Sequence, residues 1–451
     1  MPTLEWIGKS KVINHHQEVP FRVLERKYSF DESGQHNEDN GSENMIIRGD
    51  NLEALKALLP RYEGRIKCIY IDPPYNTGNE GWVYNDNVND PKIKKWLGEV
   101  VGKEGEDLTR HDKWLCMMYP RLKLLQKLLA DDGVIFISID DTECSNLILI
   151  CNEIFGASNF VANVSWQRTY SPRNDSKGIV SEVEHLVVFS KNPGWQPNKL
   201  PRTEAMDSRY KNPDNDVAPW KSSDAFAPGA ATHQGMVYAI QHPFTGEMLY
   251  PSNGRCWRYQ QSSMLEYMQG WCNYRLENLH DEKERARVCG IDESAVRKDV
   301  LAIVLEEPLE VSAAKAQKVY NRGRWPGFYF TKGGYGGIAR KTYLENVGGR
   351  LPTNLWMYEE TGHTDEAKKE LISLFGGRSP FDTPKPTRLL DFVLKVAGTS
   401  ETLMLDSFAG SGTTAHAVLN ANKADNGNRH FILIEMMDYA DSITAERVKR
   451  V

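Results

Sequence analysis

The stretch Arg65-Ile66-Lys67-Cys68-Ile69-Tyr70-Ile71 runs directly into Asp72-Pro73-Pro74-Tyr75. The first seven residues are largely apolar and of strand length, which is typical of a buried β-strand. Open α/β sheets hold their ligands just beyond the carboxyl ends of such strands. We therefore interpret Asp72, Pro73, Pro74 and Tyr75 as candidate functional residues at the edge of an α/β sheet.

Strand-like and helical segments alternate on both sides of this stretch. Apolar steps of three and four residues predict helices, and short apolar runs predict strands. The alternation favours a parallel sheet covered on both faces by helices. The predicted strands are 65–71, 134–139, 161–167, 185–190, 403–407 and 430–435, the predicted helices are 51–59, 115–129, 147–155, 389–396, 413–419 and 442–451, and 45–50 precedes the first helix.

The alternation stops in the middle of the chain. Residues from Asn192 to about Phe381 are rich in Pro, Gly, Trp and Tyr, with short mixed elements. We interpret them as an inserted domain. The predicted organisation is therefore 1–190 for one half of the α/β domain, 191–381 for the insertion and 382–451 for the other half.

Composition limits the class of protein without identifying it. With 451 residues, 40% hydrophobic and 26% charged, the chain predicts a soluble protein of two or three domains. It shows no apolar run of about 20 residues and no signal peptide. Seven cysteines occur singly, which disfavours a disulfide framework or cysteine zinc site and favours the cytoplasm. The eleven histidines show no metal-ligand spacing, and we predict no metal.

The net charge of −6 does not by itself indicate nucleic-acid binding. Charge alone favours an enzyme that acts on a small molecule. A DNA-binding protein with this balance has to gather its basic residues on one face.

The residue types in Asp72–Tyr75 suit a reaction in which an aromatic amine, such as N6 of adenine, acts as the nucleophile. The lone pair of adenine N6 is delocalised into the ring, so a carboxylate that accepts its N–H helps it toward tetrahedral geometry. The Pro73 carbonyl is a second acceptor, two prolines make the segment rigid, and Tyr75 offers a face on which a flipped base can stack. The alternative is a Pro-Pro turn with a helix-capping Asp and a packed Tyr.

A glycine loop joins a strand to a helix at Asp406–Thr414. Gly410 and Gly412 permit close approach of a ligand to the backbone, and a helix amino terminus favours a carboxylate. The loop lacks the Gly-Lys-Ser/Thr of a nucleotide-binding P-loop. Glu435 ends the next strand, where an acid can accept ribose hydroxyls. The alternative is a glycine turn with a solvated Glu. Pro384 and Pro386, around Lys385, begin a helix, for which a plain capped helix is the default interpretation.

Together these motifs resemble the β-class amino-methyltransferases, in which DPPY precedes FxGxG and a target-recognition domain lies between them. The segments Ile47–Leu55, Asp72–Gly78, Trp6–Lys9 and Gly362–Lys369 are similar to the modification subunit of type III restriction–modification systems. Such subunits are generally longer than this sequence, but we expect every strand of the catalytic sheet to precede Val451.

The resemblance implies a seven-stranded Rossmann-like methyltransferase sheet with an inserted target-recognition domain. It also implies S-adenosylmethionine as cofactor, adenine N6 of duplex DNA as target, a homodimer and a restriction subunit as partner. The residues that the resemblance implies for contact with the target base are Asp72, Pro73, Pro74 and Tyr75. The implied cofactor-binding residues are Asp50, Lys385, Asp406, Phe408, Ala409, Gly410, Gly412, Thr413 and Glu435.

A basic and aromatic segment at 321–344 is the candidate DNA contact. Its cations suit phosphates and its rings suit stacking. A β-hairpin that packs its aromatics and leaves a solvated basic edge is an equal alternative. The candidate DNA-binding residues are Arg322, Arg324, Lys332, Arg340 and Lys341. For Arg168, Arg173 and Lys177, between two predicted strands, a surface loop is the default and DNA contact the alternative.

Three other functions stay open at this point. One is a cytosine-N4 or RNA methyltransferase, another is a DNA-recognition subunit without activity, and the third is a nucleotide-binding enzyme. The missing P-loop lysine disfavours the third.

Overall fold

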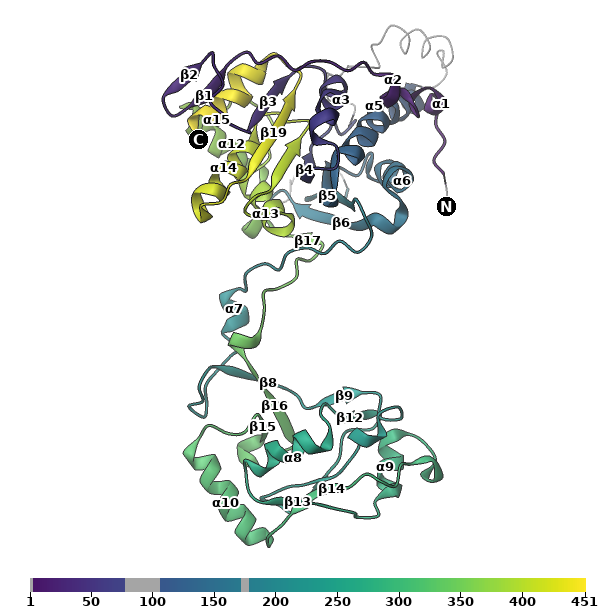
Figure 1. Ribbon diagram of the computed structural model, residues 1–451, viewed down its shortest axis with the longest axis vertical. Coiled ribbons are helices and arrows are strands. Elements are labelled where there is room, and N and C mark those ends of the chain that lie inside the picture. The colour runs from purple at the N-terminus through teal and green to yellow at the C-terminus, as the bar shows by residue number, and fades with distance from the viewer. Residues whose placement is uncertain (1–2, 78–105, 172–177) are drawn as a thin grey trace. The chain divides into compact units, whose positions relative to one another are not determined.

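The structure is a computed structural model that describes residues 3–77, 106–171 and 178–451, and it contains two compact units (Figure 1). The first unit is built from both ends of the chain, up to Leu200 and from Leu351 onward, and the second is Pro201–Arg350. Each unit is described by itself below. Across the described residues, no helix combines the length and the apolar character that crossing a membrane requires.

The insertion is shorter than the predicted 191–381. Residues on both flanks of the second unit belong to the first unit because they pack against its sheet. Asn198 N–H donates to the Val396 carbonyl, and Leu355–Trp356 pairs with Ser165–Trp166. Their composition resembles that of the insertion, so the sequence pattern placed the boundaries too far apart.

An eight-stranded sheet forms the centre of the first unit. The five strands β3, β19, β18, β4 and β5 are parallel, which the alternation with helices predicts. The eighth strand, β17, has two residues and was not predicted. In spatial order the strands are β17 (Leu355–Trp356), β6 (Phe160–Gln167), β7 (Val183–Ser190), β5 (Leu129–Ile139), β4 (Ile66–Ile71), β18 (Leu403–Asp406), β19 (His430–Glu435) and β3 (Met45–Arg48).

Strand β7 runs antiparallel to both of its neighbours. Ile139, at the carboxyl end of β5, pairs with His185 near the amino end of β7. The beginning of β7 therefore lies at the same edge as the carboxyl ends of the parallel strands. The sequence analysis expected a parallel sheet and missed this reversal, which shapes the site.

Helices cover both faces of the sheet (Figure 1). Ile69 and Ile71 of β4 pack on one face with α3 (Asn51–Tyr62), α5 (Glu106–Leu128) and α6 (Cys144–Phe155). Cys68 and Tyr70 point to the opposite face, which α13 (Thr387–Ala397) and α14 (Thr413–Asp425) cover. This alternation is the two-residue period of a strand buried on both faces.

Short elements complete the first unit. Near the amino end these are α1 (Lys9–Val12), α2 (His15–Glu18), β1 (Ser29–Asp31) and β2 (Gly34–His36). After the insertion they are α11 (Tyr358–Thr361), α12 (Thr364–Phe375), a π-helix (Ala440–Ala445) and α15 (Glu446–Arg450).

The second unit has its own hydrophobic core, built around Trp220, Trp257, Trp271, Phe328 and Phe330. Its strands form three small sheets, with the orders β11-β10-β14-β13, β12-β9 and β15-β16-β8. Its elements are α7 (Glu204–Asp207), β8 (Trp220–Asp224), β9 (Phe226–Pro228), β10 (Ile240–Gln241), β11 (Met248–Leu249), β12 (Arg255–Trp257), α8 (Gln261–Gln269), β13 (Tyr274–Glu277), α9 (Glu282–Cys289), β14 (Ala302–Leu305), α10 (Leu309–Arg322), β15 (Phe328–Phe330) and β16 (Ile338–Tyr343).

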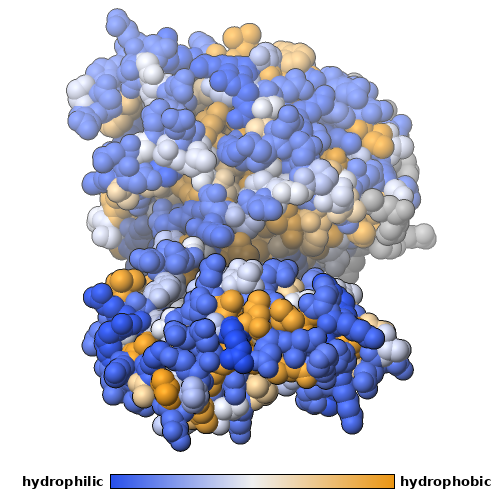
Figure 2. Space-filling model, turned by 60° about the horizontal axis from the view of Figure 1, so that its bottom comes forward, coloured by the Kyte–Doolittle hydropathy of each residue, from blue (hydrophilic) through white to orange (hydrophobic). Residues whose placement is uncertain are grey.

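Figure 2 shows hydrophobic residues gathered among hydrophilic ones on one face of the molecule, while most of that face is hydrophilic. Such a surface is ordinary for a folded chain, because polar side chains alone do not cover it. The hydrophobic core of each unit accordingly lies beneath a mixed surface.

Lys341 anchors the start of the second unit to β16. Its side chain is fully buried, forms ion pairs with Asp214 and Asp216, and donates to the Trp325 carbonyl at 2.8 Å. The ammonium also lies 4.9 Å from the centre of the Trp220 ring. A buried charge is tolerated only when it is paired in this way.

Replacing Lys341 should therefore destabilise the second unit. In Lys341→Met two buried carboxylates lose their counter-ion, and we expect a loss of about 3–5 kcal/mol in unfolding free energy. Urea unfolding followed by tryptophan fluorescence measures this, with Lys318→Met on the exposed side of α10 as the matched control. Equal stability of the two variants would contradict the anchoring role.

Candidate active site

Polar side chains from distant parts of the first unit meet at one edge of the sheet. Asp72 follows β4, Asp406 ends β18 and Glu435 ends β19, and these three strands are neighbours. Glu184 comes from the beginning of β7, and Lys385 from the segment that leads into α13. This is the edge at which the sequence predicts a site.

Lys385 is the centre of a partly buried hydrogen-bond network. Its Nζ donates to both carboxylate oxygens of Asp72 at 2.8 Å and to the Tyr75 hydroxyl at 2.9 Å. The Tyr75 hydroxyl lies 3.0 Å from Asp72 Oδ1 and 2.9 Å from Glu184 Oε2. Lys385 Nζ is 3.5 Å from Glu184 Oε2, and Arg168 Nη1 donates to Glu184 Oε1 at 2.9 Å. One ammonium thus lies between two carboxylates and a phenol.

Burial and neighbouring charges shift the pKa values in this network. Burial raises the pKa of Asp72 above its ordinary value, and Lys385 only partly offsets this effect. For Lys385, burial lowers the pKa, but the charges of Asp72 and Glu184 outweigh burial and leave it raised. Burial, Asp72 and Glu184 all raise the pKa of Tyr75. Lys385 therefore stays an ammonium and Tyr75 a neutral phenol, and both act as hydrogen-bond donors.

The position of Lys385 differs from the prediction that it binds the cofactor. Its backbone lies beside the glycine loop, because its carbonyl accepts the Thr413 hydroxyl at 3.2 Å. Its side chain instead extends to Asp72, where the uncompensated carboxylate attracts the ammonium. The side chain of Lys385 therefore contacts Asp72 in this structure, and its role in cofactor binding stays a prediction.

The segment around the prolines is held by its neighbours. Pro73 is buried, and the Pro74 carbonyl accepts Trp114 Nε1–H at 2.7 Å. Asn76 follows with a positive φ of 62° and donates its amide to the fully buried Glu143. The positive φ of Asn76 is thus accompanied by a side-chain hydrogen bond that holds this residue in place. Gly78, the last residue of the predicted motif, lies outside the described residues.

Two glycines of the loop adopt the left-handed backbone conformation. Gly410 and Gly412 have φ values of 51° and 80°, which favour glycine. A Cβ on Gly412 would lie 3.0 Å from the Thr444 carbonyl oxygen, and one on Gly410 would lie 3.3 Å from Phe381. Thr413 begins α14, so the loop leads directly into a helix amino terminus.

The acids next to this loop are buried and shape it. Asp406 accepts the Phe408 N–H at 3.0 Å and the Thr414 hydroxyl at 2.6 Å. Glu435 Oε2 accepts the Gly410 N–H at 2.8 Å. Burial raises the pKa of Asp406 to about 7, although its hydrogen bonds work in the opposite direction.

The remaining predicted cofactor residues flank the loop. The Ala409 N–H donates to the Ile434 carbonyl at 3.1 Å, which ties the loop to β19. Asp50 follows β3 at the same edge and caps α3 by accepting the Glu53 N–H at 2.8 Å. The structure thus brings these residues to the edge where the Asp72 network lies.

Sequence analysis missed Glu184 and the role of Arg168. Glu184 is 6% exposed and precedes the apolar run 185–190, so its burial next to a core strand was the available signal. A carboxylate there has to be paired, and Arg168 at the end of β6 is one partner. Arg173 and Lys177 lie outside the described residues.

The candidate DNA-binding residues separate into two groups. Arg322, Arg324 and Lys332 are at least partly accessible and Arg340 is half-buried, whereas Lys341 is buried in its ion pairs. Lys341 is therefore unsuited to phosphate contact, and its assignment is wrong.

The aromatic residues of the same segment mostly follow the β-hairpin alternative. Phe328, Tyr329 and Phe330 lie in the core of the second unit, on the antiparallel pair β15–β16, while Tyr335 is 62% exposed.

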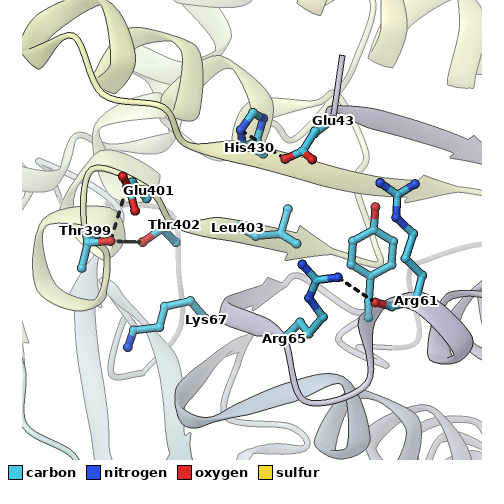
Figure 3. Close-up of a pocket in the computed structure, with 10 residues that line it drawn as sticks. Glu43, Arg61, Arg65, Lys67, Thr399, Glu401, Thr402, Leu403 and His430 are labelled. Carbon is cyan, nitrogen blue, oxygen red and sulfur yellow. Dashed lines mark hydrogen bonds and ion pairs between the residues drawn. The ribbon is translucent and has the colours of Figure 1, made fainter. Parts of the chain in front are cut away.

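A cavity of about 350 Å³ lies at the other edge of the sheet (Figure 3). Leu403 and His430, which begin β18 and β19, line it together with Arg61, Arg65 and Lys67. Because it lies at the amino ends of these strands, it contains none of the predicted site residues.

All seven cysteines are buried and carry free thiols. Among the described residues, no group of three or more His, Cys, Asp or Glu side chains is arranged to hold a metal ion.

Comparison with known proteins gives the class of this chain. Residues 66–446 match the sequence profile of a DNA methylase family, the N6/N4 methyltransferases, and the chain belongs to this family. The match covers the strand before Asp72, the insertion and the glycine loop, which confirms the resemblance drawn from the motifs.

Two of its similar relatives are modification subunits. The StyLTI Mod subunit of the type III restriction–modification enzyme from Salmonella typhimurium is 32% identical over 92% of this chain and 58% of its own length. The EcoPI Mod subunit from Escherichia phage P1 is 30% identical over 96% of this chain and 63% of its own. This chain thus spans about six tenths of their length. The type II methyltransferase M.KpnI from Klebsiella pneumoniae is 28% identical, over 88% of this chain and 81% of its own.

The raised pKa of Asp406 predicts a pH dependence of stability. The folded-state pKa of about 7 exceeds the ordinary 3.8. The protonated form therefore favours folding at low pH, and this contribution is lost as the pH rises from about 4 to 7. A shift of this size corresponds to about 4 kcal/mol as an upper estimate. Asp406→Asn removes the contribution, so its unfolding free energy relative to the parent should rise between pH 4 and 7 and stay level above pH 7.

Urea unfolding at pH 5, 6, 7 and 8 measures this difference. Asp131→Asn, an exposed carboxylate at the start of β5, is the matched control and should show no such trend. A parallel pH profile for Asp406→Asn and the parent would contradict the assigned pKa.

Proposed function

We propose that this protein transfers a methyl group from S-adenosylmethionine to N6 of adenine in duplex DNA, as the modification component of a restriction–modification system. The observation that supports this most is the position of Asp72 and Tyr75 beside the Asp406–Thr414 loop, on the neighbouring strands β4 and β18. An acceptor for an amine and a cradle for a methyl donor thus lie at one edge. Membership of the DNA methylase family agrees with this chemistry.

The glycine loop fits S-adenosylmethionine by its local chemistry. The Ser407 hydroxyl is buried in the loop without a hydrogen-bond partner among the described residues. The amino terminus of α14 suits the methionine carboxylate. Glu435 accepts the N–H groups of Gly410 and Met437, one on each oxygen, which holds its carboxylate beside the loop, where an acid can bind ribose hydroxyls. When bound, the cofactor supplies a methyl group on a positively charged sulfur.

The residues of the Asp72 network position the amine for transfer. Tyr75 presents its ring to a base that has left the duplex, and Asp72 accepts an N–H of the exocyclic amine. The amine lone pair would form the new bond to the methyl carbon while the methyl–sulfur bond breaks and leaves a neutral thioether, and the amine would lose its proton after transfer. No strong base is needed, so the rate depends on alignment.

In this proposal the second unit recognises the DNA. It is a self-contained insertion with accessible cations at Arg322, Arg324 and Lys332, and Arg340 is partly accessible. The names of the Mod relatives support a restriction subunit as partner, and a homodimer is the assembly we propose.

Replacing Asp72 tests the proposed reaction. Asp72→Ala removes the acceptor for the amine, and we expect methyl transfer to fall about 100- to 1000-fold. The assay uses labelled S-adenosylmethionine and unmethylated genomic DNA, followed by nucleoside mass spectrometry. Asp131→Ala, at the opposite edge of the sheet, is the matched control. If the product is N4-methylcytosine and not N6-methyladenine, the target base is cytosine. If Asp72→Ala keeps the activity of the parent, the proposed mechanism is wrong.

Replacing the accessible cations tests the DNA-binding face. Arg322→Gln with Arg324→Gln removes two charges that can neutralise phosphates. The slope of log K against log salt should become less steep by about 0.9 for each phosphate that is no longer neutralised. Fluorescence anisotropy with duplex DNA measures the slope. Lys283→Gln with Lys298→Gln, elsewhere on the second unit, removes the same charge as a control. An equal effect of the two pairs would show that only net charge matters.

A further inference from the structure

Asp72 is already occupied by the ammonium of Lys385. Both carboxylate oxygens accept Nζ–H at 2.8 Å, and the Tyr75 hydroxyl is 3.0 Å from Oδ1. An amine that binds Asp72 in the position now held by Nζ has to displace Lys385. A buried ammonium without a partner is unfavourable, so the displaced group needs another acceptor nearby.

Glu184 is placed to be that acceptor. Its side chain is 8% exposed, and its Oε2 lies 3.5 Å from Lys385 Nζ. Arg168 holds Oε1 at 2.9 Å, and the Tyr75 hydroxyl holds Oε2 at 2.9 Å. The carboxylate is thus fixed from two sides while one oxygen faces the ammonium. A small movement of Nζ converts the 3.5 Å separation into a hydrogen bond.

Tyr75 makes this exchange possible without leaving an acceptor unpaired. Its hydroxyl has one proton and lies within hydrogen-bond distance of both Asp72 and Glu184. When the ammonium is on Asp72, the phenol can donate to Glu184. When the ammonium moves to Glu184, that carboxylate no longer depends on the phenol.

We propose that Glu184 is a positioning residue that receives the Lys385 ammonium when the target amine binds to Asp72. This proposal rests on the proposed function, because it assigns a step of substrate binding at the same site. Glu184 does not touch the substrate amine. It acts through Lys385 and through the Tyr75 hydroxyl.

A crystal structure of the Asp72→Asn variant tests the exchange without any need for activity. Removing the charge at position 72 should release Lys385, and Nζ should move to about 3 Å or less from Glu184 Oε2. If Nζ stays beside the substituted side chain, or turns away from Glu184, the proposal is wrong. This outcome is independent of whether the protein methylates DNA.

A double-mutant cycle tests the exchange in the reaction. Glu184→Gln keeps the size of the side chain but removes the charge that receives Lys385. Single-turnover methyl transfer should slow on the order of 10- to 100-fold, with unchanged affinity for S-adenosylmethionine and duplex DNA. In a Lys385→Met background there is no ammonium to displace, and the same change should have less than about a twofold effect. A purely structural role would give the same factor in both backgrounds and would overturn the proposal.

The control for this cycle is Glu182→Gln. It removes an equal charge two residues earlier in the chain, and its side chain is outside the network. Equal slowing by Glu182→Gln and Glu184→Gln would also overturn the proposal. Inactivity of the unchanged protein on all DNA would reject the proposed function, and the Asp72→Asn structure would still decide the exchange.

Discussion

The need to neutralise buried charge at one edge of the sheet governs the architecture of the site. Asp72, Glu184 and Lys385 come from three segments of the chain, and Lys385 is far from the other two in sequence. They meet because β4 ends where the antiparallel strand β7 begins, while the segment before α13 crosses the same edge. None of these charges is stable there alone. The carboxylates and the ammonium therefore require one another, and together they require the strand order that brings them close.

The same constraint links the two functional halves of the first unit. The Lys385 carbonyl accepts the hydroxyl of Thr413, the first residue of α14, while its side chain holds Asp72. One residue thus connects the glycine loop to the Asp72 network. Arg447, which is fully buried, donates to Thr413 and Ser411 and ties the loop to the last helix of the chain. A change at the loop is therefore expected to be felt at the carboxylate, because these contacts form a continuous path.

The sequence predicted the elements better than their mutual directions. Six of the eight sheet strands and the covering helices follow from apolar periodicity, because both faces of the sheet are buried. Strand β3 lies in the segment 45–50, which was placed before the first helix but was not predicted as a strand. The eighth strand, Leu355–Trp356, is too short to give such a pattern. The direction of β7 does not follow from its composition, so Glu184 could not be assigned to the site. Lys385 was recognised by its motif, but the direction of a long side chain depends on where the opposite charges lie.

The two units depend on different interactions. The second unit has its own aromatic core and its own buried ion cluster at Lys341, so its fold does not rely on the Asp72 network. In the first unit, both flanks of the insertion are fixed to the sheet, by Asn198 on one side and by β17 on the other. Short β17 also covers part of the edge strand β6, which would otherwise be open to pairing with other chains. Exposed residues between these fixed points can therefore change without disturbing the carboxylates and the ammonium at the sheet edge.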